Sequence, residues 1–412
     1  MSMGDKGRHK PECLTLGSLE GVRVLDLGHY LAAPFAATLL GDFGAEVIKV
    51  EAPGIGDAMR GANPLYEGKS LMFTANARNK KSVTVDMRKT EGQAIIRDLA
   101  KVSDVIVENF RPGTLERWNL GYEDLNKVNS GVVMLRISGF GQTGPDRHKT
   151  GVGTTAQARS GYTYMCGYPD RPPLTAPIPL ADYIAGTFGA LGVMTALYYR
   201  DAAGSRKGQY IDAALYEGLF RYMEDQPALY DKLGVAQERQ GEEHARTAPV
   251  GTFQSKDGKW LSVTAAGNAL FPRLCNVMGR PDLAEEGLFA NQEGRGKYYR
   301  EINAIVREWI SQHTSREVLN LCENGGVPAE PVQSMADIFT DPLFRVRENI
   351  VEIGDPELGS VKMPGVTPKL SLTPGRVTSS APQLGAHTDE VLGGLLGYSE
   401  ERLDSLRRSG VI

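Results

Sequence analysis

Apolar runs alternate with segments of helical spacing through the first third of the chain. Runs typical of buried strands occupy residues 21–28, 46–53, 82–87, 104–110 and 132–141. Helical spacing occupies residues 31–44 and 90–102. Because strands separated by such helices favour a parallel sheet with helices on both faces, we expect an α/β fold. Ligands of these sheets bind beyond the carboxyl ends of the strands, here in the loops 28–34, 51–61, 108–117 and 138–150.

The second half of the chain has a different pattern, which predicts a second domain. Near residue 245 apolar and polar positions begin to alternate, and an Asp-Gly pair at 257–258 marks the turn of a predicted hairpin. Helical spacing follows through 269–327, and residues 330–365 predict a helix and then another hairpin. The Pro- and Ser-rich stretch 366–384 is expected to run extended.

Composition and charge exclude several classes of protein. Of 412 residues, 41% are hydrophobic and 23% charged, which is ordinary for a soluble globular protein of two or three domains. The net charge is -4 with scattered Lys and Arg, so no surface field would attract nucleic acid or an anionic membrane. No apolar run approaches the ~20 residues of a membrane helix, and the polar N-terminus does not resemble a signal peptide. We therefore expect a cytoplasmic protein.

Motifs for common cofactors and metals are missing from the sequence. The four cysteines, Cys13, Cys166, Cys275 and Cys322, are widely spaced, which predicts free thiols. No glycine-rich dinucleotide fingerprint or P-loop follows a strand, and the Gly-rich segment 139–145 lacks the P-loop lysine. The histidines occur singly and there is no nucleophile elbow. Redox, metal-dependent and serine-hydrolase functions therefore have little support.

Asp182 is the carboxylate with the most informative surroundings. It lies in the apolar segment PIPLADYIAG, just before a helix of small residues at 185–200. A carboxylate at that place is often a helix N-cap. In an enclosed apolar site, however, its poor solvation would make it a better nucleophile towards a thioester carbonyl. The residues alone leave both roles open.

The sequence resembles the family III CoA-transferases over nearly its whole length. The matching segments lie in family order at 19–57, 76–87, 103–125, 137–145, 181–200 and 384–392, the last reading LGAHTDEVL. The resemblance places Asp182 at the catalytic aspartate of the family. It therefore favours the nucleophile over the N-cap.

The resemblance implies a fold, an assembly and a reaction. The expected fold is α/β, with a Rossmann-like large domain whose parallel sheet is built from both chain ends, a smaller α+β domain, and an interlocked homodimer. The segments would be 1–224 and 329–412 for the large domain and 225–328 for the small one. The implied reaction transfers CoA from an acyl-CoA to a free carboxylic acid through mixed anhydrides and an aspartyl-CoA thioester on Asp182. No metal and no bound cofactor is implied, since CoA enters as part of the substrate.

The family's contact residues can be carried over by position. The implied CoA-binding residues are Arg117, Arg111, Asn109, Phe110, Val85, Asp86, Met87 and Arg88. Basic residues there would hold the phosphates of CoA. The first loop, with Tyr30, Leu31 and Ala32, would line the substrate pocket. Lys80 and Lys81 are further candidates.

Departures from other family branches narrow the function. The racemase branch, the alternative function, has a His-Asp pair after the 137–145 segment, whereas this chain has Val152 and Gly153, so the general base for α-proton transfer is missing. Leu31 and Ala52 replace the glutamine and arginine of the formyl-CoA branch. These replacements make racemisation, oxalate and formate poor candidates.

Two acceptor classes remain open. Segments 154–162, 181–186 and 211–223 are most similar to carnitine CoA-transferases. Tyr162, Tyr164 and Tyr168 could then form an aromatic cage for a quaternary ammonium group. Dicarboxylate-specific members share much of the same frame, so acceptors of the carnitine type and dicarboxylates both remain candidates. The segment 264–271 occupies the place of the family's glycine-rich lid but retains only Gly267.

Overall fold

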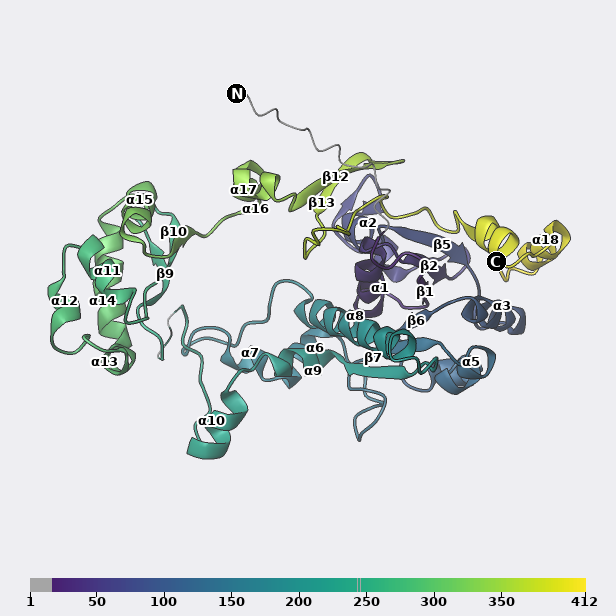
Figure 1. Ribbon diagram of the computed structural model, residues 1–412, viewed down its shortest axis with the longest axis horizontal. Coiled ribbons are helices and arrows are strands. Elements are labelled where there is room, and N and C mark those ends of the chain that lie inside the picture. Colours follow the sequence, from purple (N-terminus) through teal and green to yellow (C-terminus); the bar gives the residue numbers. More distant parts are fainter. Residues whose placement is uncertain (1–16, 243, 245) are drawn as a thin grey trace, which may run out of the picture. The chain divides into compact units, whose positions relative to one another are not determined.

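The structure is a computed structural model that describes residues 17–412 apart from 243 and 245 (Figure 1). The chain forms two compact units. The first runs to Ser160 and takes in Pro177–Tyr222 and Arg345–Ile412, so it draws on both ends of the chain. The second comprises Gly161–Ala176 and Met223–Phe344. Residues 161–176, 223–224 and 329–344, which the sequence assigns to the large domain, thus group with the second unit.

A six-stranded sheet with every neighbouring pair parallel forms the centre of the first unit. Its strand order is β5-β2-β1-β6-β7-β8. The strands are β1 (Arg23–Asp26), β2 (Glu46–Glu51), β5 (Lys80–Thr84), β6 (Val105–Glu108), β7 (Val133–Ser138) and β8 (Tyr210–Ala214). Leu25, Ile48, Ile106 and Met134 form one row across four strands and lie in a single buried cluster. The predicted α/β fold with a large parallel sheet is confirmed.

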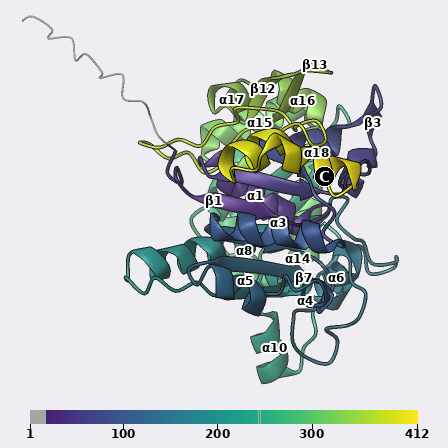
Figure 2. The ribbon, with the colours of Figure 1, turned by 90° about the vertical axis from the view of Figure 1, so that its right-hand side faces the viewer.

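Helices cover both faces of this sheet (Figures 1 and 2). One face carries α1 (Ala32–Asp42) and α8 (Leu180–Asp201), and the other carries α3 (Thr90–Lys101), α5 (Tyr122–Val128) and α18 (Glu400–Arg408). Glycines bring α8 close to its neighbours. A Cβ on Gly186 would lie 2.7 Å from the Ala32 carbonyl oxygen, and one on Gly189 would lie 2.7 Å from Leu135.

The length and apolarity of α8 contradict one expectation from sequence. By these two criteria alone, Leu180–Asp201 could cross a membrane, so the expectation that no segment reaches this length and apolarity is wrong. Small and apolar residues gather here because the helix packs against α1, β7 and β8. One face of the helix therefore packs into the core of the first unit.

Short elements complete the first unit. They are η1 (Ala58–Gly61), β3 (Leu65–Tyr66), β4 (Lys69–Ser70), α2 (Leu71–Asn76), α4 (Thr114–Arg117), α6 (Gly153–Arg159), α9 (Leu215–Arg221), β12 (Ile350–Asp355), β13 (Gly359–Pro364) and η2 (Glu390–Leu395). Strands β12 and β13 form the hairpin predicted within 330–365. Residues 366–384 contain no helix or strand, as expected.

The LGAHT segment covers the outer edge of β5. Ser82 N–H donates to His387 Nδ1 at 3.2 Å, and Thr84 N–H donates to Thr388 Oγ1 at 3.1 Å. Gly385 N–H donates to Ser82 Oγ at 2.9 Å. These side chains satisfy edge N–H groups that a neighbouring strand would otherwise bind.

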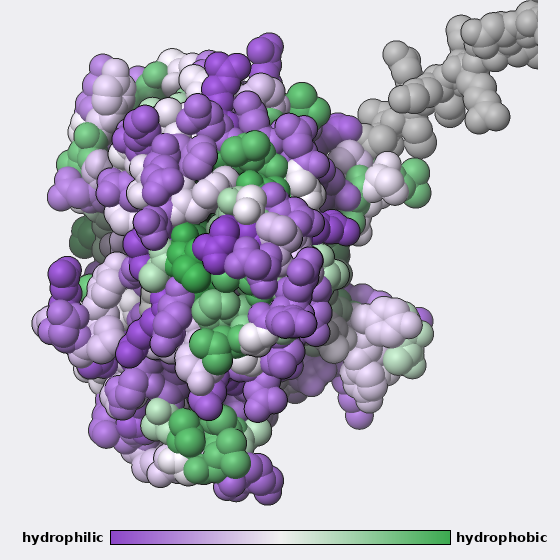
Figure 3. Space-filling model, turned by 90° about the vertical axis from the view of Figure 1, so that its left-hand side faces the viewer, coloured by the Kyte–Doolittle hydropathy of each residue, from purple (hydrophilic) through white to green (hydrophobic). Residues whose placement is uncertain are grey.

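The second unit has its own antiparallel sheet and its own core. Strands β9 (Val250–Gln254) and β10 (Trp260–Thr264) form the predicted hairpin, and β11 (Ala329–Pro331) extends it. Its helices are α7 (Tyr162–Met165), α10 (Gln226–Leu233), α11 (Phe271–Val277), α12 (Asp282–Glu285), α13 (Gln292–Lys297), α14 (Tyr299–Ser311), α15 (Ser315–Gly325) and α16 (Met335–Thr340), followed by α17 (Pro342–Val346) at the boundary. Figure 3 shows a mostly hydrophilic surface on which hydrophobic side chains form separate small patches.

A buried arginine anchors the segment 264–271 in the second unit. Arg295 donates to the Ala266 carbonyl at 2.8 Å and to Asn268 Oδ1 at 2.7 Å. It also donates to the Phe289 carbonyl at 2.9 Å. These three bonds connect α13, which contains Arg295, to the segment 264–271 and to Phe289. A lid role for 264–271 stays a prediction.

Candidate active site

Asp182 lies in the first turn of α8 with a poorly solvated carboxylate. Burial raises the pKa of Asp182 from its ordinary 3.8 to about 6, and only its own backbone N–H opposes this shift. Among the described residues, no side chain donates a hydrogen bond to this carboxylate or forms an ion pair with it. Pro179 occupies the N-cap position of α8. The N-cap role considered from sequence therefore does not belong to Asp182.

The backbone of Gly153 lies directly against this carboxylate. A Cβ at residue 153 would be only 2.1 Å from Asp182 Oδ2. A second glycine contact brings this segment to the end of β7, since a Cβ on Gly139 would lie 2.8 Å from Gly151 Cα. A side chain at residue 153 would therefore have to displace the carboxylate. In the sequence Gly153 stands out only as a departure from the racemase branch, and its contact with Asp182 follows from the fold.

The loop that follows β1 connects the predicted CoA segment with α8. At one end, Asn109 accepts from His29 N–H and donates to the His29 carbonyl, both at 2.7 Å. The His29 ring meets Phe110 edge to face, with centroids 4.6 Å apart. Beyond the loop, in the first turn of α1, Phe35 meets Tyr183 edge to face, with ring centroids 4.8 Å apart. The loop and the start of α1 together thus connect the 109–110 segment with the residue after Asp182.

The three predicted substrate-pocket residues differ in exposure. Tyr30 is 44% exposed, whereas Leu31 and Ala32 are buried. The side chain of Leu31 packs in a cluster with Met59 and Phe73. Only Tyr30 therefore presents its side chain at the surface, because the chain turns inward to begin α1. The substrate contacts of all three stay predictions.

The predicted CoA-binding residues of loop 109–117 surround an aromatic contact. Phe110 lies between His29 and Trp118, whose centroid is 5.4 Å away. Arg111 and Arg117 are exposed, and neither forms an ion pair within the described part of the chain. The Arg117 guanidinium donates to Thr114 Oγ1 at 3.1 Å. Both guanidinium groups can therefore reach an anion without breaking an existing pair.

The predicted CoA segment 85–88 follows β5 and is more enclosed. Val85 and Met87 belong to the buried cluster beneath the sheet. Asp86 pairs with Arg88 through two bonds of 2.8 and 3.0 Å, which hold the pKa of Asp86 below its usual range. Contacts from Val85 and Met87 would therefore come from their backbone.

Lys80 and Lys81 are engaged elsewhere. Lys80 Nζ is buried 2.9 Å from Asp26 Oδ2, and Lys81 pairs with Glu46 and Glu390 at 2.7 and 2.8 Å. Binding of CoA by either lysine would require an existing ion pair to break.

Glu108 is a further buried carboxylate near the CoA segment. It ends β6, pairs with Arg136 at 2.7 Å and accepts from Phe110 N–H at 2.7 Å. Burial raises the pKa of Glu108 to about 7, although Arg136 opposes the shift. Glu108 was not among the residues predicted from the sequence, where its signal is an acidic residue at the end of an apolar run, DVIVENF.

Comparisons with known proteins decide the family. The sequence model of CoA-transferase family III matches residues 19–388. The chain belongs to CoA-transferase family III. The prediction of a CoA-transferase is therefore confirmed.

Relatives of this family match nearly the whole chain. Succinyl-CoA--L-malate CoA-transferase beta subunit from Chloroflexus aurantiacus is 44% identical, over 96% of this chain and 98% of that one. Succinyl-CoA--D-citramalate CoA-transferase from the same organism is 42% identical, over 96% and 98%. The crystal structure of a CAIB/BAIF family protein from Brucella suis has a TM-score of 0.81 and 31% identity, over 92% of this chain and all of that one.

Metal ligands do not gather anywhere in the part of the chain that the structure describes. No group of three or more His, Cys, Asp or Glu side chains there could hold a metal ion. Cys166, Cys275 and Cys322 are free thiols, and Cys13 lies outside the described residues. The expectation of a reaction without metal or bound cofactor stays a prediction.

Proposed function

We propose that this CoA-transferase moves CoA from an acyl-CoA donor to a free carboxylic acid, with Asp182 as the covalent relay. One observation carries the proposal. The Asp182 carboxylate is buried, has no cationic partner among the described residues, and lies against the bare backbone of Gly153. A carboxylate in such surroundings is ionised at neutral pH yet poorly solvated, which favours attack on a thioester.

The reaction would proceed in two symmetrical halves. An Asp182 oxygen attacks the thioester carbonyl carbon, and the C–S bond breaks to give CoA thiolate and a mixed anhydride. The thiolate attacks the Asp182 carbonyl carbon, which releases the donor carboxylate and leaves an aspartyl-CoA thioester. The acceptor carboxylate attacks this thioester, and the released thiolate then attacks the acceptor's carbonyl carbon in the new anhydride. Product acyl-CoA leaves and the Asp182 carboxylate is restored.

Every intermediate in this sequence is an activated acyl group. Transfer therefore conserves the free energy of the thioester, provided that water is kept out. No proton has to be stored on the protein, since carboxylates and thiolates exchange with one another. The apolar surroundings of Asp182 support such a reaction. We propose that no metal and no bound cofactor takes part.

We further propose succinyl-CoA as donor and a dicarboxylic acid of the malate or citramalate kind as acceptor. Two nearly full-length relatives with more than 40% identity carry these substrates in their names. They favour the dicarboxylate over the carnitine-type acceptor left open by the sequence.

We also propose a homodimer that works in the cytoplasm. Leu191, Met194, Tyr198 and Tyr199 are exposed on α8, and a second subunit would bury such side chains. The name of one relative as a beta subunit makes pairing with a related chain the alternative.

A matrix of substrates tests the function. Purified protein is incubated with succinyl-CoA or butyrobetainyl-CoA, each with malate, citramalate, glutarate or carnitine, and new acyl-CoA products are followed by mass spectrometry. We expect mixtures of succinyl-CoA with malate or citramalate to give the new thioester only when both partners are present. Deuterium entering a single acyl-CoA without an acceptor would instead support the racemase alternative.

A paired variant tests the relay. Asp182→Ala should lower transfer by at least about 1,000-fold, because it removes the nucleophile. Asp201→Ala, at the exposed far end of the same helix, should leave transfer unchanged. Hydroxylamine added with acyl-CoA should trap a hydroxamate on the peptide containing Asp182. Full activity of Asp182→Ala, or a hydroxamate elsewhere, would contradict the assignment.

A further inference from the structure

Four ionisable side chains lie buried together beside the loop 28–32. Asp26, Lys49, Asp57 and Lys80 are each at most 3% exposed. Lys49 Nζ lies 2.7 Å from Asp57 Oδ2 and 3.8 Å from Asp26 Oδ2, and Lys80 Nζ lies 2.9 Å from Asp26 Oδ2. We call these four residues the ion network. Its two cations and two carboxylates balance, as buried charges must.

Each member of the ion network also binds the backbone of the loop or of its exit. At Gly28, the N–H donates to Asp26 at 3.0 Å and the carbonyl accepts from Lys49 at 3.1 Å. Asp57 accepts from Tyr30 N–H, with its two oxygens at 3.0 and 3.1 Å. Lys80 donates to the Pro34 carbonyl at 2.6 Å. The charged groups thus hold the backbone at Gly28, Tyr30 and Pro34. Removing any one of them would release a backbone group.

The loop needs such restraint because its backbone is strained. Tyr30 has φ of +60°, in the left-handed region that a bulky residue rarely adopts. Strained conformations of this kind persist only where their surroundings over-determine them. Asp57 supplies this restraint at the strained residue itself, since both of its oxygens lie within reach of Tyr30 N–H.

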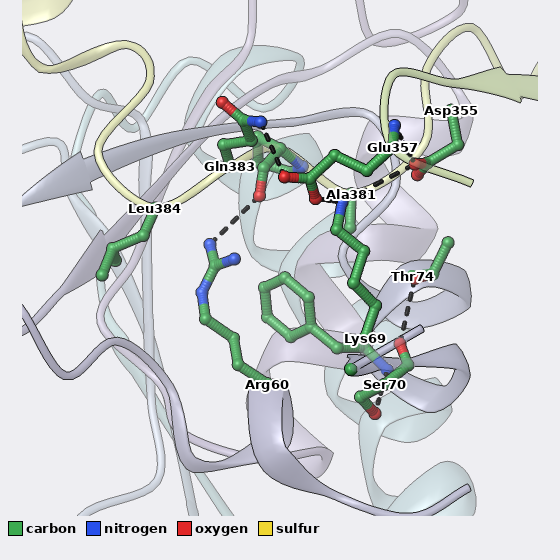
Figure 4. A pocket seen from close by; sticks show the side chains of 12 residues that line it. Arg60, Lys69, Ser70, Thr74, Asp355, Glu357, Ala381, Gln383 and Leu384 are labelled. Carbon is green, nitrogen blue, oxygen red and sulfur yellow. Dashed lines mark hydrogen bonds and ion pairs between the residues drawn. The ribbon is translucent and has the colours of Figure 1, made fainter. Parts of the chain in front are cut away.

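Next to the ion network, Glu51 and Arg60 form a further ion pair. Glu51 accepts from Asp57 N–H at 2.9 Å and binds Arg60 through two bonds of 2.7 Å. Arg60 faces a cavity of about 310 Å³, where it donates to the Pro382 carbonyl at 3.1 Å (Figure 4). In the same cavity Lys69 pairs with Glu357. These charges already have partners, so the arrangement favours a positioning role over anion binding.

We propose that Asp57, held in place by Lys49, is a positioning residue for CoA transfer. By accepting Tyr30 N–H it fixes the loop between Asn109 and the first turn of α8, so that substrate and nucleophile keep their alignment. This inference rests on the proposed function. A misplacement of about 1 Å can lower a rate roughly 100-fold, even when it arises away from the reacting atoms.

A graded series at residue 57 tests the inference. Asp57→Asn keeps one oxygen for Tyr30 N–H and should lower kcat about tenfold, whereas Asp57→Ala keeps none and should lower it roughly 100-fold. The KM for acyl-CoA should change by less than about threefold in both, because the loop positions the substrate and does not hold its nucleotide. Hydrogen exchange of the peptide around Tyr30 should quicken in the same order.

Asp42→Asn is the matched control. Asp42 is as buried as Asp57 and pairs with Arg78 at 3.0 Å, but it ends α1 and, among the described residues, forms no hydrogen bond to the loop 28–32. It should lower thermal stability while kcat stays within about twofold and exchange around Tyr30 is unchanged. If Asp57→Ala does not fold, Asp57→Asn and Asp42→Asn decide the question between them.

The outcomes separate the two proposals. Wild-type protein without transfer activity on any substrate pair would overturn the proposed function, and the positioning role with it. Active wild type with equal kcat in Asp57→Asn and Asp42→Asn would overturn the positioning role alone. Faster exchange around Tyr30 with unchanged kcat would also overturn it, since the loop would then be loosened without consequence for the reaction.

Discussion

The first unit contains two buried acidic regions that treat negative charge in opposite ways. At the end of β1 and in the loop after β2, Asp26 and Asp57 are surrounded by lysines and N–H groups. Burial alone would raise the pKa of Asp57, but Lys49 and these hydrogen bonds hold it below its usual range. At the start of α8, Asp182 has no such partner among the described residues, and its pKa is raised to about 6.

This contrast separates rigidity from reactivity. A carboxylate whose charge is met by lysines and N–H groups is a weak nucleophile but a firm anchor. A carboxylate that is merely buried is destabilised as an anion and gains by forming a covalent bond. The fold places the paired carboxylates of Asp26 and Asp57 beside the loop 28–32, and it places Asp182 in the first turn of α8.

Removing the charge of Asp26 and of Asp182 should change the free energy of unfolding in opposite directions, which is the largest effect that we expect. Asp26→Asn should lower the free energy of unfolding by roughly 3–5 kcal/mol, because it leaves two buried lysines with one carboxylate. Asp182→Asn should raise it by up to about 3 kcal/mol at pH 8, following a pKa raised by about two units. Denaturant unfolding at pH 8 measures both.

The sign of the Asp182 effect follows from linkage. Since its folded pKa lies above the unfolded value, its favourable contribution is full below about pH 4 and is lost as pH rises through about 6. The stabilisation by Asp182→Asn should therefore shrink between pH 8 and pH 5. An Asp182→Asn variant that is less stable than the wild type at pH 8 would contradict this prediction.

A methyl group at residue 153 tests how closely the nucleophile is enclosed. Gly153→Ala places a Cβ against Asp182 Oδ2 and should lower kcat/KM roughly 100-fold by displacing the carboxylate. Gly394→Ala is the control, since nothing lies within 4 Å of a Cβ there and the residue is exposed. Steady-state kinetics of both variants measure the effect. Activity of Gly153→Ala within about twofold of wild type would show that the site is roomier than described.

The pH profile should show the smallest effect. Because Asp182 must be ionised to attack, kcat/KM should fall tenfold per pH unit below about 6 and level off above it. Steady-state assays from pH 4.5 to 8 measure this. Glu108, whose pKa is raised to about 7, is the other candidate for the inflection, so Glu108→Gln should leave the midpoint near 6. If the midpoint disappeared in Glu108→Gln, the pH dependence would belong to Glu108 and not to Asp182.

Local patterns allowed much of the fold to be predicted. The strands at 46–51 and 133–138 lie inside the runs identified from sequence, because buried parallel strands are continuously apolar. The edge strand β11 was missed, since three residues carry no period. Asp182 was found through its family motif.

The pairing of buried charges could not be predicted. Lys49 and Asp57 are eight positions apart on a strand and in the loop beyond it, and only the folded loop brings them to 2.7 Å. The sequence did carry a signal, since EVIKVE places Lys49 between the apolar residues Ile48 and Val50. Similarly, the inward turn of Leu31 depends on Met59 and Phe73, which pack against it from later in the chain. Such contacts follow from tertiary packing and leave no local period.

The covered edge of β5 has a consequence for how the protein is made. The side chains that close this edge, His387 and Thr388, lie 305 and 304 residues after their partners in β5, so they leave the ribosome long after that strand. Domains generally fold as units in the order in which they emerge. The edge of β5 therefore stays uncovered while residues 223–344 are translated. During this interval the nascent chain is exposed to edge-to-edge association.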